Sequence, residues 1–395
     1  MKTYDWIVVG AGITGAALSY ELAKKGFSVL LLEQNKAIAN ATRFSYGGIF
    51  YWSGTTELTR LLNTEGIHLH RILSDELEFD TQFRELDLLL TIYPGENSEE
   101  IAATYANCAI PPRLIGVKEA CDLEPLLNPQ ALAAALVVRQ GIINPEATVI
   151  AYCQAFKRVG GCLEIDRVLE LLKQNNTIIG VKTASQIYHS ANVAICAGGL
   201  TRPLLKSAGI FAKVYFTRAE LLETAPTYLQ LQTMVVPARL QRLQLEALAS
   251  TPEIEKLWDE PERELAPPIL DAGAIQLLDG RIRIGQYSRV FTNHEILFDS
   301  TNQLKSQEEI TAKIANILPA LGNLPASWHQ CLVAFSPDRL PCIGAIPGWQ
   351  GIHIFSGFSS SPLGMVPPLA RRFANYMATG EDEILPLMSP ARFLK

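Results

Sequence analysis

The start of the chain follows the apolar and polar pattern of a strand, a helix and a second strand. Residues 6–9 (Trp-Ile-Val-Val) and 29–32 (Val-Leu-Leu-Leu) are apolar runs of strand length. The segment between them has helical spacing of its apolar positions and ends at Gly26, which suits a helix C-cap. Two strands joined by a helix are typical of a βαβ unit with a parallel sheet.

The same patterns predict further elements along the chain. Helices are expected over residues 57–77, 145–158, 306–318 and 367–379, and within 251–268 between flanking loops. Strands are expected over 86–93, 161–165, 178–183, 187–197, 342–344 and 352–356, in segments of 214–248, and in a hairpin over 274–287. Residues 40–50 are expected to form a loop. A β-rich region thus interrupts the α/β pattern, which indicates a discontinuous two-domain α/β protein.

A glycine motif stands at the junction of the first strand and the first helix. Gly10, Gly12 and Gly15 form GxGxxG, and Glu33 ends the next apolar run. Gly10 allows a sharp turn, Gly12 lets a pyrophosphate approach the backbone, and Gly15 lets the helix pack on the sheet. The helix N-terminus offers free N–H groups to phosphates, and Glu33 can accept hydrogen bonds from a ribose. This combination predicts dinucleotide binding, and an ordinary glycine-rich turn is the alternative.

Composition and charge narrow the class of protein. The chain has 395 residues, of which 48% are hydrophobic and 19% charged, and this mix suits a globular protein with a sizeable core. A net charge of −6 gives no basic face for nucleic acid, and no apolar run reaches the length of a membrane span. Seven dispersed cysteines and six histidines show no metal-ligand spacing. We therefore expect no metal and a reducing, cytoplasmic setting.

Four segments together resemble the flavoprotein family that includes D-amino acid oxidase, glycine oxidase and monomeric sarcosine oxidase. They are the fingerprint of residues 5–33, the Thr-Arg-Phe-Ser-Tyr-Gly-Gly loop of 42–48, the strand ending in Ala-Gly-Gly at 193–199, and Ser-Pro-Asp-Arg-Leu-Pro-Cys-Ile-Gly at 336–344 followed by Ser-Gly-Phe-Ser at 356–359. Their order and spacing cover nearly the whole chain. An NAD-dependent dehydrogenase would share only the first segment.

The resemblance implies a fold and a function. It implies a Rossmann-like FAD-binding domain of the glutathione-reductase type, over 1–46, 145–212 and 326–395. A discontinuous α+β substrate domain on a mixed sheet would comprise 47–144 and 213–325. The expected reaction is oxidation of the C–N bond of a small amine or amino acid, with hydride transfer to flavin N5 and oxygen or another acceptor reoxidising the flavin. The alternatives are an FAD-dependent dehydrogenase of a hydroxy acid and a non-catalytic flavin-binding assembly factor.

The resemblance also assigns cofactor contacts. The expected contacts are Gly10, Gly12, Ile13, Thr14, Gly15, Glu33, Gln34, Thr42, Arg43, Ser45, Gly47, Gly48, Val168, Ala197, Gly198, Cys331, Gly357, Phe358, Ser359, Gly364 and Met365. Cys331 lies six residues before the Pro-Asp pair, where sarcosine oxidases attach FAD covalently. A covalent cysteinyl-flavin at Cys331 is therefore one hypothesis, and a small buried cysteine is the other.

Three residues are expected to take part in catalysis: Arg283, Tyr46 and Tyr287. Arg283 falls where the family's oxidases carry a lysine near flavin N5, and it keeps the positive charge. Tyr46 begins an aromatic cluster with Phe50, Tyr51 and Trp52 that forms either a cage around an amine or flavin, or ordinary core packing.

The family's basic groups for a substrate carboxylate are missing at the aligned positions. These positions hold Tyr46, Val333 and Gly364. Either another arginine, with Arg43, Arg218 and Arg289 as candidates, has taken over, or the substrate is not a simple amino-acid carboxylate.

Overall fold

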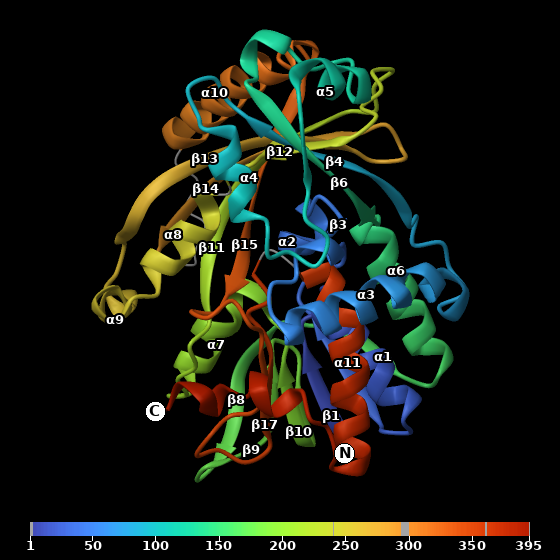
Figure 1. Ribbon diagram of the computed structural model, residues 1–395. Coiled ribbons are helices and arrows are strands. Elements are labelled where there is room, and N and C mark those ends of the chain that lie inside the picture. The colour runs from blue at the N-terminus through green and yellow to red at the C-terminus, as the bar shows by residue number, and fades with distance from the viewer. Residues whose placement is uncertain (1–2, 240, 294–299, 360–361, 395) are drawn as a thin grey trace.

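The computed structural model describes residues 3–239, 241–293, 300–359 and 362–394. These residues form two sheets, one in the lower and one in the upper half of the view in Figure 1. None of the helices in the described part of the chain is long and apolar enough to cross a membrane.

The first sheet has the strand order β16-β17-β10-β1-β2-β7, and β9 and β8 extend it from β10. The strands β1, β2, β7, β10 and β17 run parallel, whereas β8, β9 and β16 are antiparallel to their neighbours. Their bounds are β1 (Thr3–Val9), β2 (Val29–Glu33), β7 (Cys162–Ile165), β8 (Val168–Gln174), β9 (Thr177–Thr183), β10 (Ile187–Ile195), β16 (Cys342–Ala345) and β17 (Ile352–Ser356).

Alternating side chains of β1 supply the cores on both faces of this sheet. Trp6 and Val8 pack with α1 (Ile13–Lys24), α3 (Glu57–Glu76), α6 (Pro145–Arg158) and α11 (Pro362–Thr379), which gather on one side in Figure 1. Ile7 and Val9 face the other side, toward β8 and β9. This period of two is what a strand buried on both faces requires.

The second sheet has the order β15-β11-β14-β13-β12-β4-β6-β3, with β5 paired to β6. It is mixed, because β12 runs parallel to β4 and the other pairs are antiparallel. Its strands are β3 (Gly48–Ile49), β4 (Arg84–Ile92), β5 (Arg113–Ile115), β6 (Ala134–Ile142), β11 (Tyr215–Thr224), β12 (Met234–Pro237), β13 (Glu264–Gln276), β14 (Ile282–Phe291) and β15 (Ala326–Phe335).

Of the remaining helices, α7 (Thr201–Ser207) packs against the first sheet near β8, and the others cover the second sheet and its connections. The others are α2 (Asn40–Phe44), α4 (Ser98–Thr104), α5 (Val117–Leu123), α8 (Gln241–Ala249), α9 (Pro252–Glu255) and α10 (Ser300–Ile317). One face of the sheet packs under α10, which lies at the top of Figure 1. The other face, with Leu88, Leu90 and Met234, turns away from α10.

The structure confirms the helices and strands that a clear local sequence pattern predicts, and it corrects several of the others. The N-terminal strand–helix–strand unit, α3, α6 and the hairpin of β13 and β14 are present. The loop predicted over 40–50 is wrong, because it contains α2 and β3, and residues 241–249 form α8 instead of a strand. The elements α4, α5, β6 and β8 were not predicted. α11 begins at Pro362, five residues earlier than predicted, and contains Pro367 and Pro368.

The predicted domain boundaries assign two elements to the wrong half of the molecule. β15 pairs with β11 in the second sheet, although residues 326–395 were assigned to the FAD-binding domain. α3 packs in the core of the first sheet, with Leu62, Ile67 and Leu73 buried there. The division into two domains stays a prediction, and these elements cross it.

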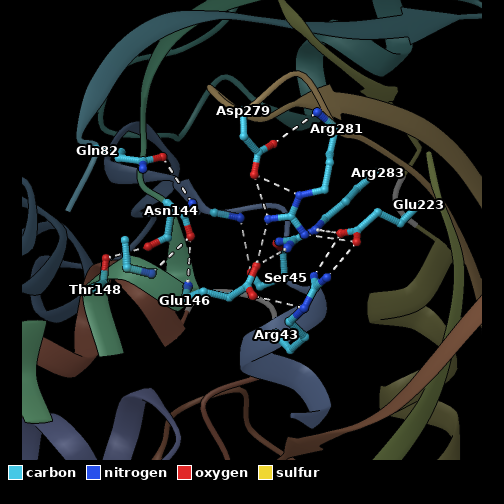
Figure 2. Close-up of polar contacts among 12 residues, drawn as sticks. Arg43, Ser45, Gln82, Asn144, Glu146, Thr148, Glu223, Asp279, Arg281 and Arg283 are labelled. Atoms are coloured by element: carbon cyan, nitrogen blue, oxygen red, sulfur yellow. Dashed lines mark hydrogen bonds and ion pairs between the residues drawn. The ribbon is translucent and has the colours of Figure 1, made fainter. Parts of the chain in front are cut away.

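A network of arginines and acidic side chains joins the two halves (Figure 2). Arg43 of α2 donates to both carboxylate oxygens of Glu223 on β11, at 2.7 and 2.9 Å, and its Nε lies 3.0 Å from Glu146 of α6. Arg283 of β14 and Arg281, which directly precedes that strand, each contact both Glu146 and Glu223. The network therefore ties α2 and α6 to two strands of the second sheet.

The central carboxylate of this network is strongly stabilised in its ionised form. Glu223 is only 7% exposed, and burial alone would raise the pKa of its carboxyl group. Hydrogen bonds from Arg43 and Arg283, together with their charges, outweigh burial and lower the pKa to about 2. Its contribution to the free energy of unfolding is complete above the ordinary pKa of about 4.5 and is lost as the pH falls toward 2.

Glu223→Gln should lower the free energy of unfolding by about 3–5 kcal/mol at neutral pH, because it leaves buried arginine charge uncompensated. Urea unfolding measures this effect, and the difference between the two proteins should shrink as the pH falls below about 4.5. Glu119→Gln is the matched control, because Glu119 pairs with Arg113 on an exposed surface. Equal midpoints for the Glu223 variant and the native chain would contradict a stabilising network.

Candidate active site

The glycine turn between β1 and α1 is fixed by close backbone contacts. Gly10 has φ +101°, and a Cβ there would lie 2.7 Å from the carbonyl oxygen of Cys196. A Cβ on Gly15 would lie 1.8 Å from the carbonyl oxygen of Gly10. Both distances are shorter than any real contact, so α1 can approach β1 and the end of β10 only with glycine at these positions.

Polar groups gather at the N-terminus of α1. The hydroxyl of Thr42 accepts a hydrogen bond from the N–H of Ile13 at 3.2 Å. Glu33, at the end of β2, accepts from the N–H of Ala11 at 2.8 Å and from that of Asn35 at 2.9 Å. The acid at the end of β2 thus lies directly beside the turn, as the fingerprint requires.

A cavity of about 1590 Å³ runs from this turn to the second sheet. At one end it is lined by residues 10–14 and 33–42, and it passes residues 196–200 and 356–359. At the other end it reaches Leu88, Leu90, Met234 and Val236 on the face of the second sheet that turns away from α10. One continuous space therefore connects a phosphate-binding turn with an apolar wall.

The residues at the turn fit a dinucleotide cofactor. A Cβ on Gly12 would lie 3.1 Å from the Thr42 hydroxyl, so any side chain there would crowd this part of the backbone. Most predicted cofactor contacts line the cavity, namely Gly10, Gly12, Ile13, Thr14, Glu33, Gln34, Thr42, Ser45, Gly48, Val168, Ala197, Gly198, Cys331, Gly357, Phe358, Ser359 and Met365. Their contacts with FAD stay a prediction.

Four predicted cofactor contacts do not line the cavity. Gly15 lies beneath the turn, and Arg43 belongs to the ion-pair network. A Cβ on Gly47 would lie 2.1 Å from the carbonyl oxygen of Ile143. The carbonyl oxygen of Gly364 would lie 2.0 Å from a Cβ on Gly66, so glycine at position 66 lets α11 approach α3, whereas a Cβ on Gly364 would meet only Ile49, at 3.5 Å. The geometry gives Gly15 and Gly47 a packing role and sets no such requirement at Gly364.

Of the three predicted catalytic residues, only Tyr46 lines the cavity. Its hydroxyl donates to the carbonyl oxygens of Gly285 at 2.7 Å or Gly273 at 3.2 Å, and burial raises its pKa. Arg283 is fully buried, donates to the carbonyl oxygen of Ser45, and contacts Glu146 and Glu223. It therefore supports the loop that carries Tyr46 and does not reach the cavity.

Tyr287 packs on the opposite face of the sheet, in the core under α10, with the guanidinium of Arg289 4.4 Å from its ring centre. Regular alternation along β14 would turn Tyr287 to the same side as Arg283. The pairing with β11 skips Gln286 of β14, because Glu220 lies opposite Tyr287 and Leu221 lies opposite Gly285. This irregularity breaks the alternation, so Ile284 and Tyr287 share one face. The sequence could not reveal this irregularity.

None of the arginines proposed as carboxylate anchors lines the cavity. Arg289 pairs with Glu220 at 3.2 Å, and Arg218 lies 5.2 Å over the ring of Phe291. Arg43 is held by Glu223. The aligned positions where relatives carry a basic anchor hold no basic side chain. Of these positions, Tyr46 and Val333 line the cavity and Gly364 does not.

Sequence reasoning missed the residues that supply charge at the second-sheet end. Asp271 of β13 and Arg242 of α8 both line the cavity, and neither belongs to a recognisable motif. The aromatic cluster contributes to the wall through Phe50 and Trp52, whose rings lie 6.4 Å apart. Trp52 is also core, because only 3% of it is exposed.

Gly15→Ala should abolish tight FAD binding, because the added methyl group forces α1 away from the turn. The measurement is FAD retained after gel filtration, from the flavin absorbance per protein. Gly116→Ala is the control, since a Cβ there meets nothing within 4 Å. Full FAD content in the Gly15 variant would refute the assignment of this turn.

Comparison with known proteins agrees with this geometry. The chain is 25% identical to glycine oxidase of Pseudomonas aeruginosa over 98% of this chain and 97% of that protein. It is 24% identical to the mitochondrial pyruvate dehydrogenase phosphatase regulatory subunit of Mus musculus, covering 95% of this chain but only 41% of that protein. The fold matches L-proline dehydrogenase from P. horikoshii, with a TM-score of 0.79 and 22% identity over 100% of this chain and 98% of the other. The sequence model of the DAO family, FAD dependent oxidoreductase, matches residues 5–376, so the chain belongs to this family.

Proposed function

We propose that this FAD-dependent oxidoreductase oxidises the C–N bond of an amine or amino acid. The observation that carries the proposal is the single cavity that joins the glycine turn to the apolar face of the second sheet. Bound FAD would supply the hydride acceptor, which no amino-acid side chain can provide. The chain itself has to hold the substrate against that acceptor and keep water out.

The second-sheet end of the cavity suits the carbon part of a substrate. Leu88, Leu90, Met234 and Val236 form its wall, and Trp52 closes part of it. Such a surface buries apolar groups and excludes water from the reacting atoms. The names of similar proteins support the substrate class: glycine oxidase, monomeric sarcosine oxidase of Streptomyces avermitilis and L-proline dehydrogenase.

Anaerobic mixing of the FAD-loaded protein with separate amines, amino acids and hydroxy acids tests the proposal. We expect at least one amine or amino acid to bleach the visible absorbance of the flavin, and the hydroxy acids to leave it unchanged. Readmitting air then distinguishes an oxidase, which forms peroxide, from a dehydrogenase. Bleaching by hydroxy acids alone would contradict C–N oxidation.

A second candidate is a flavin-binding regulatory protein without turnover. The absence of a basic carboxylate anchor at the aligned positions and the similarity to the mouse regulatory subunit favour it. A protein that retains FAD but whose flavin no amine, amino acid or hydroxy acid reduces would support this candidate.

Covalent attachment of FAD through Cys331 also stays a prediction. Cys331 lines the cavity from β15, and only 3% of it is exposed. Burial raises the pKa of its thiol to about 12, so the reactive thiolate is scarce until a cofactor or nearby charge stabilises it.

Acid precipitation of the FAD-loaded protein measures the attachment. If the bond forms, the flavin colour stays in the protein pellet and moves to the supernatant with Cys331→Ala. Cys342→Ala is the matched control, because Cys342 is buried like Cys331 but does not line the cavity. Colour in the supernatant of the native chain would exclude the covalent bond.

A further inference from the structure

We propose that Asp271 binds the ammonium group of the substrate and accepts its proton. This inference rests on the proposed C–N oxidation and names the substrate class as a cationic amine with an apolar body. It also offers a reason why the aligned carboxylate anchors are absent.

Asp271 stands out by its place in the cavity wall. Many strand residues of the second sheet line the cavity, and among those that the structure describes Asp271 is the only charged one. The same end of the cavity is lined by Leu88, Met234 and Val236. A single carboxylate on an apolar wall is the arrangement that recognises one cationic group attached to a carbon skeleton.

The carboxylate of Asp271 has hydrogen bonds but no ion pair within the described part of the chain. It accepts from the backbone N–H groups of Gln241 at 3.3 Å and Arg242 at 3.1 Å, at the start of α8. These donors fix its position. No described lysine, arginine or histidine forms a salt bridge with it, so its negative charge is left for a ligand.

Arg242 forms its ion pair with Glu246 and none with Asp271, although its Nη2 is buried without a hydrogen-bond partner among the described residues. Its Nε lies 2.8 Å from Glu246, which is 3% exposed. Glu246 also accepts from Thr217 at 3.3 Å and from Ser359 at 2.5 Å.

The Arg242–Glu246 pair is neutral, and Arg239, which also lines the cavity, pairs with Glu96 at 3.2 Å. Asp271 therefore leaves one negative charge without an ion-pair partner, which favours a cation over a carboxylate at this wall.

The surroundings of Asp271 also suit proton transfer. Burial raises the pKa of its carboxyl group above the ordinary value, while the two backbone N–H donors and the charge of Arg242 oppose that rise. The other titratable groups acting on it are the hydroxyls of Tyr46, Tyr93 and Tyr105, all with raised pKa values. A carboxylate of higher pKa is a better base near neutral pH.

The chemistry needs such a base. An ammonium ion has no free electron pair to stabilise the positive charge that develops when hydride leaves the neighbouring carbon. In the proposed step one N–H bond of the ammonium breaks, and an O–H bond forms on Asp271. The neutral amine keeps the electron pair, and FAD, the hydride acceptor of the proposed function, takes up the two electrons in the oxidation that follows.

A ligand that cannot be oxidised tests the site independently of turnover. The probe is 2-phenylpropan-2-amine, which has no hydrogen on the carbon beside nitrogen, and binding to the FAD-loaded protein is followed by the shift of the flavin spectrum. We expect Asp271→Asn to weaken binding at least ~10-fold, since it removes a charge-assisted contact. The neutral alcohol of the same skeleton should bind the two proteins equally, and the carboxylate should bind the variant at least as tightly as the native chain, since the substitution removes a repulsive charge.

Asp87→Asn is the matched control, because Asp87 is on β4 of the same sheet but pairs with Arg139 outside the cavity. FAD retention and the melting temperature show that each variant is folded. Should the Asp271 variant not fold, binding of the amine to the native chain must weaken as the pH falls through the raised pKa of Asp271. Equal amine binding in the folded variant, or binding by the native chain that ignores pH, would overturn the inference.

The rate of anaerobic flavin reduction by an oxidisable amine then separates a base from a mere anchor. With Asp271→Asn the rate should be low at neutral pH and rise about tenfold per pH unit, because only the free amine reacts. The native chain should show a flatter profile. Identical profiles would overturn the role as a base, whereas absence of reduction in both proteins alongside intact amine binding would overturn the proposed function and leave the ammonium site supported.

Discussion

Two ionised glutamates and three arginines hold the halves of this protein together beside the cavity. Glu146 of α6 and Glu223 of β11 lie between Arg43, Arg281 and Arg283, so elements from both sheets are joined by opposite charges (Figure 2). Arg283 also donates to the carbonyl oxygen of Ser45, in the loop that leads to Tyr46. Because this loop lines the cavity, the same contacts that join the halves fix part of the cavity wall.

Ion pairs also explain why the arginines that were expected to bind a substrate carboxylate do not line the cavity. Arg43 and Arg283 are both saturated by carboxylates, and Arg289 pairs with Glu220. A guanidinium matched in this way has little affinity left for a substrate carboxylate. At the second-sheet end of the cavity, Arg242 and Arg239 are paired with glutamates, and Asp271 supplies the charge that has no ion-pair partner among the described residues. The electrostatics of this pocket thus differ from those expected for an amino-acid carboxylate.

Local sequence signals made the cofactor-binding end of the cavity predictable. The glycine turn, Glu33 and the helix that follows are specified within about thirty residues of sequence, and the structure brings them together. The segments of 196–199 and 356–359 were found through resemblance, and they line the same cavity. Tyr287 was misplaced because its orientation depends on an extra residue, Gln286, in its own strand. Asp271 was missed because an isolated aspartate becomes informative only once the sheet turns it toward the cavity.

Hydrogen–deuterium exchange tests most directly whether one cavity serves cofactor and substrate. On adding FAD to the FAD-free protein, amide exchange should slow at Gly10–Gly15 and also at Gly357–Ser359, which lie more than three hundred residues away in sequence. Adding 2-phenylpropan-2-amine should then slow exchange at the start of α8 and in β13, around Asp271. Protection by FAD confined to the glycine turn, or an amine effect that leaves α8 and β13 unchanged, would contradict the account.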